Sequence, residues 1–133
     1  MSEFDSEALG RRLAELADSK GAEEIVVLDM RGLVSYTDFL TICTARNDRQ
    51  AQAIVDEVKL RLKREQGLLP GGADGEGAAG WVVLDYLDCV LHVFTDEARR
   101  RYRLEELWRE APAIELQLPQ NDVRRHLYGA AHG

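Results

Sequence analysis

Two aspartates, Asp85 and Asp88, have the residue type and spacing that could support metal chemistry. Carboxylates held on a sheet bind Mg²⁺ in nucleotide-transferring enzymes. Those enzymes need the acids at adjacent positions of one strand face, together with a phosphate-binding loop. Here Asp85 falls at the end of an apolar run and Asp88 in the turn that follows. A turn acid beside an exposed strand acid is therefore the favoured interpretation.

A glycine-rich segment, PGGADGEGAAG at residues 70–80, is the second candidate for chemistry. A phosphate-binding P-loop needs a lysine and a hydroxyl residue after its glycines, at the start of a helix. In this chain the glycines run into Trp81 and a strand-like segment, and Asp74 and Glu76 would repel a phosphate. The segment predicts a flexible loop and argues against nucleotide binding.

The remaining reactive side chains lack the neighbours that catalysis requires. His92 lies within a strand-like run, with no serine or acid at a spacing that indicates a nucleophile relay. Cys43 and Cys89 lie in apolar runs without a base or helix start that would lower the pKa of a thiol. We therefore predict a partly buried structural histidine, two buried free thiols, and no catalytic residue, metal or cofactor.

Trp81 begins the strand-like run after the glycine-rich loop, and two roles for it stay open. It either covers the core or anchors an interface. Tyr86, Leu87 and the acids on the same hairpin favour the second role, because interfaces combine aromatic anchors with surrounding charge. A basic turn follows and is expected to be solvated, with weak ion pairs to nearby glutamates; it contains Arg99, Arg100, Arg101 and Arg103.

The charge distribution indicates the kind of partner. The 133-residue chain has a net charge of −7 and no lysine or arginine between Arg64 and Arg99. This balance argues against direct binding to a nucleic-acid backbone, which attracts basic faces. A negative potential over residues 65–98 would instead steer basic proteins toward that surface.

Length and composition indicate one globular domain without a membrane span. The sequence is 45% hydrophobic and 31% charged, and no apolar run approaches the roughly 18 residues of a membrane helix. The acidic start lacks the basic and apolar segments of a secretion signal. With two isolated cysteines, these features predict a soluble cytoplasmic protein.

Hydrophobic spacing predicts an α/β sandwich with a mixed sheet flanked by helices. Helical spacing covers residues 6–19, a second helix opens near Asp48 and ends at Gly67, and a third runs from residue 95 or 96 to Trp108. A short helix is expected near residues 122–127. Strands are expected at residues 25–30, 39–45, 81–86 and 89–94, the first two paired as neighbours and the last two as a hairpin.

Two groups of motifs occur along the chain in a fixed order. The first is VVLDMRG at residues 26–32, followed by YTDFLTICT at residues 36–44. The second is GWVVLDY at residues 80–86 with DCVLHVF at residues 88–94, continuing to Trp108. Together these motifs resemble the RsfS/Iojap family of ribosomal silencing factors. The resemblance covers roughly residues 5–109, and we assign residues 1–109 to an RsfS/Iojap-like domain and 110–133 to a tail of unknown role.

The resemblance implies a nucleotidyltransferase-like fold without catalytic residues, and a ribosome-binding protein that is not an enzyme. It implies binding to the large ribosomal subunit through its basic ribosomal protein number fourteen. A factor bound there would sterically block joining of the small subunit and repress translation. It also implies a homodimer when free, with no membrane and no sequence-specific nucleic acid as partner. The chain departs from the family at Leu87, where a glycine is usual.

The expected contact surface combines apolar and acidic residues of the hairpin with the last helix. Trp81, Tyr86 and Leu87 would supply apolar contact, and Asp85 and Asp88 would face basic side chains. The border would be formed by Tyr102 and Glu105. Two alternatives stay open, a dimeric adaptor for a different basic protein and a degenerate nucleotidyltransferase.

Overall fold

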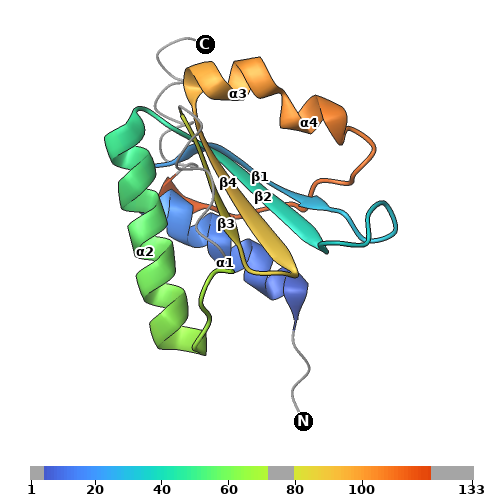
Figure 1. Ribbon diagram of the computed structural model, residues 1–133, viewed down its shortest axis with the longest axis horizontal. Helices are drawn as coiled ribbons and strands as arrows, with labels where there is room; N and C mark the ends of the chain where they lie inside the picture. The colour runs from blue at the N-terminus through green and yellow to red at the C-terminus, as the bar shows by residue number, and fades with distance from the viewer. Residues whose placement is uncertain (1–4, 72–79, 121–133) are drawn as a thin grey trace.

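The structure is a computed structural model that describes residues 5–71 and 80–120. It is a four-stranded mixed sheet with helices on both faces (Figure 1), as the sequence predicts. The nucleotidyltransferase likeness stays a prediction. The elements are α1 (Ser6–Ser19), β1 (Glu23–Asp29), β2 (Phe39–Ala45), α2 (Asp48–Gln66), β3 (Trp81–Asp85), β4 (Cys89–Thr95), α3 (Asp96–Tyr102) and α4 (Leu104–Leu107).

The two long helices begin and end at residues suited to these positions. Asp5 caps α1 by accepting a hydrogen bond from the Ala8 N–H at 3.1 Å. Asn47 caps α2 by accepting one from the Gln50 N–H at 2.8 Å. Short polar side chains satisfy the free N–H groups of a first helical turn. Gly67 ends α2 in the left-handed conformation, which glycine adopts at low cost. The predicted bounds of both helices are confirmed.

The sheet has the strand order β1-β2-β4-β3. Strands β2 and β4 are parallel neighbours, while β1 pairs antiparallel with β2 and β3 antiparallel with β4. The predicted pairing of the first two strands and the predicted hairpin are both confirmed. Strands β1 and β3 are consequently the two outer strands.

The two faces of the sheet are covered unequally. Helices α1 and α2 pack on one face and bury most of the apolar side chains, including Leu13, Ile54, Val58 and Leu91. A smaller apolar cluster lies on the other face, where α3 and α4 pack near Phe94 and Ile42. Figure 1 shows α3 and α4 above the sheet, across from α2. Both cysteines are buried and free, as predicted.

The last helix differs from the prediction of one continuous element up to Trp108. Arg103 lies at φ +48°, in the left-handed region, and separates α3 from the single turn α4. The interruption lets Glu105 reach back to Arg99, six residues earlier, a spacing that a continuous helix does not bring into contact.

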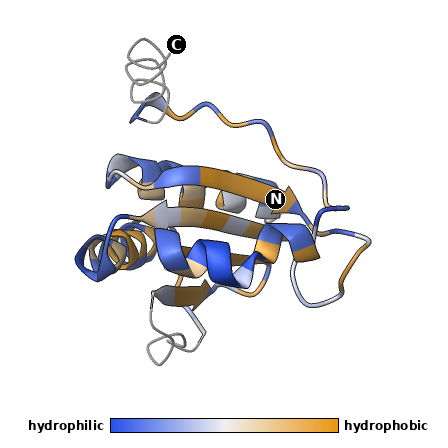
Figure 2. Ribbon diagram, turned by 90° about the horizontal axis from the view of Figure 1, so that it is seen from above, coloured by the Kyte–Doolittle hydropathy of each residue, from blue (hydrophilic) through white to orange (hydrophobic). Residues whose placement is uncertain are grey.

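Beyond α4 the chain returns to the β1 edge of the sheet. The Asp29 N–H donates to the Pro112 carbonyl, and the Ile114 N–H donates to the Val27 carbonyl, both at 2.8 Å. Figure 2 shows this segment beside the outermost strand. Leu118 is 6% exposed and belongs to the main core. The division at residue 109 stays a prediction, and the predicted helix at residues 122–127 lies outside the described residues.

None of the described helices combines the length and the apolar character that crossing a membrane requires.

Candidate functional site

One face of the outer strand β3 carries the candidate binding residues. Because side chains alternate along a strand, Trp81, Val83 and Asp85 point to the face opposite α1 and α2. All three are only partly buried. We call these three residues the outer β3 face. Val83 was not predicted as a site residue, although the two-residue period of the strand could have identified it.

Trp81 lies at the centre of an aromatic cluster. Its ring centroid is 5.0 Å from that of Phe94 and 4.7 Å from that of Tyr102. Its indole Nε1–H donates to Nδ1 of His92 at 3.0 Å. Trp81 thus covers the smaller core with one side while staying partly exposed. Tyr102 is 42% exposed beside it.

His92 is held as a neutral hydrogen-bond acceptor. Its Nδ1 receives the Trp81 indole hydrogen bond, so that nitrogen carries no proton in this arrangement. Burial lowers the pKa of His92 to about 4, against an opposing effect of the Asp85 carboxylate. The predicted partial burial of His92 is confirmed, and the ring helps to hold Trp81 by accepting its indole hydrogen bond.

The tip of the hairpin carries Leu87 and Asp88 at the far end of β3. Leu87 is 73% exposed and has φ +70°. Its N–H donates to Asp85 Oδ1 at 2.7 Å. The Asp88 carbonyl accepts from the N–H groups of Asp38 at 2.8 Å and Phe39 at 3.1 Å. The backbone of the tip is therefore fixed, while the Leu87 side chain projects outward.

The structure places Tyr86 in the core. It is 6% exposed and packs in the cluster under α1 and α2. Burial raises its pKa to about 12, and its hydroxyl has no hydrogen-bond partner among the described residues. This placement does not support the expected direct contact with a partner. The even-numbered residues of this strand point inward, so Tyr86 faces away from Trp81 and Asp85.

Glu105 forms an ion pair with Arg99 in which the arginine is buried and the glutamate is partly exposed. Arg99 is 8% exposed, so the expectation that this arginine is solvated is wrong. Its guanidinium donates to both carboxylate oxygens of Glu105, at 2.9 and 2.7 Å. It also donates to Thr44 Oγ1 at 2.8 Å and to the Glu24 carbonyl. Arg99 thereby joins α3 and α4 to β1 and β2, which positions Tyr102.

The predicted site residues form two groups at opposite ends of β3. Trp81 and Tyr102 lie at the α3 end, while Leu87 and Asp88 lie at the hairpin tip with Asp85 beside them. The four steps from Trp81 to Asp85 correspond to roughly 13 Å at a rise of about 3.3 Å per residue. Val83 lies between the groups, so the outer β3 face connects them.

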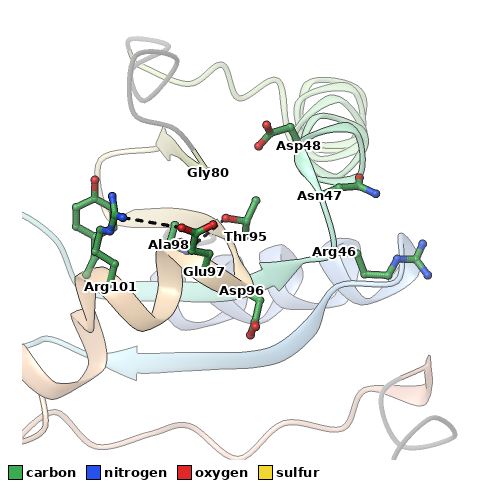
Figure 3. Close-up of a pocket in the computed structure, with 10 residues that line it drawn as sticks. Arg46, Asn47, Asp48, Gly80, Thr95, Asp96, Glu97, Ala98 and Arg101 are labelled. Carbon is green, nitrogen blue, oxygen red and sulfur yellow. Dashed lines mark hydrogen bonds and ion pairs between the residues drawn. The ribbon is translucent and has the colours of Figure 1, made fainter.

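A cleft of about 520 Å³ lies where the parallel strands β2 and β4 end and α2 and α3 begin (Figure 3). Ligands of α/β proteins often bind at such ends. Three acids line this cleft, Asp48, Asp96 and Glu97. Arg101 also lines it and lies 3.9 Å from Glu97, whereas Arg46 extends away from the cleft in Figure 3. A Cβ on Gly80 would lie 2.3 Å from Thr95 Oγ1. The acids oppose phosphate binding, and the described residues contain no group of three or more metal-ligating side chains.

The fold and these residues define a small α/β domain whose exposed apolar and acidic strand face suits protein binding. The family model described as "Ribosomal silencing factor during starvation" matches residues 3–131, and the chain belongs to this family. The match includes most of the segment after residue 109.

Relatives and a solved structure agree with this assignment. The chain is 41% identical to the ribosomal silencing factor RsfS of Halalkalibacterium halodurans over 100 residues, covering 75% of this chain and 85% of the relative. It is 39% identical to that of Bacillus subtilis over 108 residues, covering 81% and 91%. A crystal structure from Bacillus halodurans superposes with a TM-score of 0.68 at 39% identity, covering 84% of this chain and all of that one. A ribosome-silencing role follows from the family.

Proposed function

We propose that this protein represses translation without catalysis, by binding the basic ribosomal protein number fourteen of the large subunit. Bound there, the protein would sterically block association of the large subunit with the small subunit. The family supports a silencing role. The observation that carries the proposed contact is the partly exposed aromatic and apolar surface along β3, with Asp85 and Asp88 at its hairpin end.

The parts of this surface would contribute in different ways. Trp81 and Tyr102 form a rigid aromatic pair, the kind of anchor that supplies most of the affinity of an interface. Leu87 adds an exposed apolar side chain at the other end. Asp85 and Asp88 are the acidic side chains of the hairpin and would set orientation and encounter rate with a basic partner.

Subunit joining is the direct test of the proposed mechanism. Purified small and large subunits are mixed with and without the protein and separated on a sucrose gradient. We expect the joined peak to fall and the protein to travel with the large subunit alone. Unchanged joining, with the protein at the top of the gradient, would favour an adaptor for another basic protein. Magnesium-dependent nucleotide binding in calorimetry would favour the degenerate enzyme.

A pair of variants with matched exposure tests the surface. Tyr102→Ala removes an aromatic ring that is 42% exposed at the proposed contact, and Leu60→Ala removes a side chain that is 43% exposed on α2. We expect Tyr102→Ala to weaken large-subunit binding about tenfold or more, as loss of an aromatic anchor does. Leu60→Ala should bind as the unchanged protein does. Equal binding by both variants would remove Tyr102 from the contact.

Two further expectations belong to this proposal and stay predictions. Action on ribosomes would place the protein in the cytoplasm. A homodimer in the absence of ribosomes is testable by light scattering at several concentrations.

A further inference from the structure

We propose that the outer edge of β3 binds its partner by strand addition, pairing its backbone with an extended segment of a basic protein. This inference rests on the proposed function and specifies how the partner is held. Strand addition joins an extended peptide to an open sheet edge through main-chain hydrogen bonds. Side-chain pockets beside the edge then select the partner.

The pairing register determines which backbone groups of β3 point outward. The Tyr86 N–H donates to the Cys89 carbonyl, and the Thr95 N–H donates to the Gly80 carbonyl. In an antiparallel pair the hydrogen-bonded positions alternate. Val82 and Leu84 therefore bond to β4, whereas Trp81, Val83 and Asp85 direct their N–H and C=O groups away from the sheet.

Only one part of this outer edge has a partner within residues 5–71 and 80–120. The Gly71 N–H donates to the Asp85 carbonyl at 2.7 Å, which also confirms the outward direction of that residue. No hydrogen bond from the described residues reaches the outward groups of Trp81 and Val83. Among the described residues, the outward backbone groups between Gly80 and the Asp85 carbonyl therefore have no hydrogen-bond partner.

The side chains beside this stretch match an extended segment of basic character. Trp81 and Val83 are partly exposed on the outer β3 face and would pack against alternate apolar residues of an added strand. The charged residues of the hairpin are Asp85 and Asp88, and the sequence has no lysine or arginine from residue 65 to residue 98. An added strand would thus place its apolar residues over Trp81 and Val83 and its basic residues near the hairpin tip.

Amide hydrogen exchange of the full chain, followed residue by residue with NMR, tests this pairing. In the free protein the outward amides of Trp81 and Val83 should exchange faster than the inward amides of Val82 and Leu84. Addition of purified ribosomal protein number fourteen should slow exchange at Trp81 and Val83 by at least about tenfold. The exchange rates at Val82 and Leu84 should change much less.

The outcomes separate the inference from the proposed function. Binding that leaves the Trp81 and Val83 amides unprotected would overturn strand addition while the proposed partner stands. Absence of binding would overturn both. Protection that rises with concentration in the protein alone would show a second copy on this edge and would also overturn the assignment.

Two substitutions at one position isolate the backbone contribution. Val83→Ala and Val83→Pro both remove the branched valine side chain, but only proline, whose ring closes on the backbone nitrogen, also removes the outward N–H. Proline is tolerated at edge positions whose N–H points away from the sheet. We expect Val83→Pro to bind about three- to tenfold more weakly than Val83→Ala, the effect of one lost hydrogen bond. Equal affinity of the two variants would mean that the N–H of Val83 makes no bond to the partner.

Discussion

The two outer strands of the sheet, β1 and β3, have differently protected edges. At β1 the C-terminal segment supplies the Pro112 carbonyl and the Ile114 N–H to the outward groups of Asp29 and Val27. At β3 the described residues supply one bond, from Gly71, and leave the stretch around Val83 open. Figure 2 shows the C-terminal segment beside β1, away from β3.

This difference shows how a small domain can direct the pairing of added strands to one edge of its sheet. An unpaired edge invites association with any extended chain, so folded proteins cover or charge their edges. Here one edge is covered by the chain itself. The other is short and has Asp85 and Asp88 at its hairpin end, where they disfavour acidic partners and admit basic ones. Covering one edge and leaving the other available would thus restrict strand pairing to one specific binding site.

The largest expected effect comes from removing one bond that closes the β1 edge. Ile114→Pro deletes the N–H that reaches the Val27 carbonyl, and Val27 is fully buried. The variant also loses the packing of a partly buried side chain. Together these changes should lower the free energy of unfolding by about 3 kcal/mol. Urea denaturation followed by tryptophan fluorescence measures this change.

Ile114→Val serves as the control for the β1 edge. It keeps the N–H and removes one methylene, so its cost should be no more than about 1 kcal/mol. If both variants lose the same stability, side-chain packing alone holds the segment. The hydrogen bonds at the β1 edge would then contribute little to stability, and β1 and β3 would differ less in how their backbones are held.

The sequence predicts the long elements well because their signals are local. Asn47 and Gly67 mark the ends of α2 by side-chain capping and by backbone freedom, and neither depends on distant residues. The covering of β1 has no such signal. Ile114, Leu116 and Leu118 alternate with polar residues, as in an extended segment with one buried side. This pattern does not indicate which strand the segment lies beside, because its position depends on bonds to a strand more than eighty residues earlier in the chain.

The candidate site was predicted only in part because sequence neighbours need not share a face. Tyr86 follows Asp85, yet its ring lies on the opposite side of the sheet and is buried. Arg99 resembles its exposed neighbours in sequence, but its contact with Glu105 depends on the left-handed turn at Arg103. Arginine is not a residue that marks such a turn, so this break had no signal.

An effect of intermediate size on the free energy of unfolding is expected from protonation of His92, whose ring contacts Trp81 of β3. Burial lowers the pKa of His92 in the folded protein to about 4, below the usual value of 6.5. Between these values the unfolded chain binds a proton that the folded protein does not. Stability therefore falls as the pH drops from about 6.5 to 4, while the contribution of His92 levels off above about pH 7. The loss should be on the order of 2 kcal/mol for this partly exposed ring.

Unfolding free energies measured from pH 7 to pH 4 test the histidine effect against a variant that cannot titrate. In His92→Gln, the side-chain amide oxygen can still accept a hydrogen bond from the Trp81 indole. We expect the slope across this window to flatten in the variant. If the slope of unfolding free energy against pH stayed unchanged, the dependence would come from carboxylates elsewhere in the molecule. The neutral state of His92 would then not contribute to the stability of the region around β3.

The smallest expected effect is at Leu87, at the tip of the hairpin. Leu87 has φ +70°, a conformation that costs a side-chain-bearing residue energy but that glycine adopts freely. It is also 73% exposed, so its removal sacrifices little burial. Leu87→Gly should raise the free energy of unfolding by up to about 1 kcal/mol, since the relief of strain is offset by the greater entropy of unfolded glycine. Denaturation in urea measures the gain.

Leu87→Ala separates the two roles of this residue. Alanine keeps the Cβ and hence the strain, so we expect no gain in stability, but it removes the same apolar contact as glycine. If the hairpin tip contacts the proposed partner, both variants should bind it a few-fold more weakly. Unchanged binding by both would restrict the contact to the Trp81 end of β3. A stability gain in both would mean that the exposed leucine, not its backbone conformation, is the unfavourable feature, because only glycine relieves the positive φ.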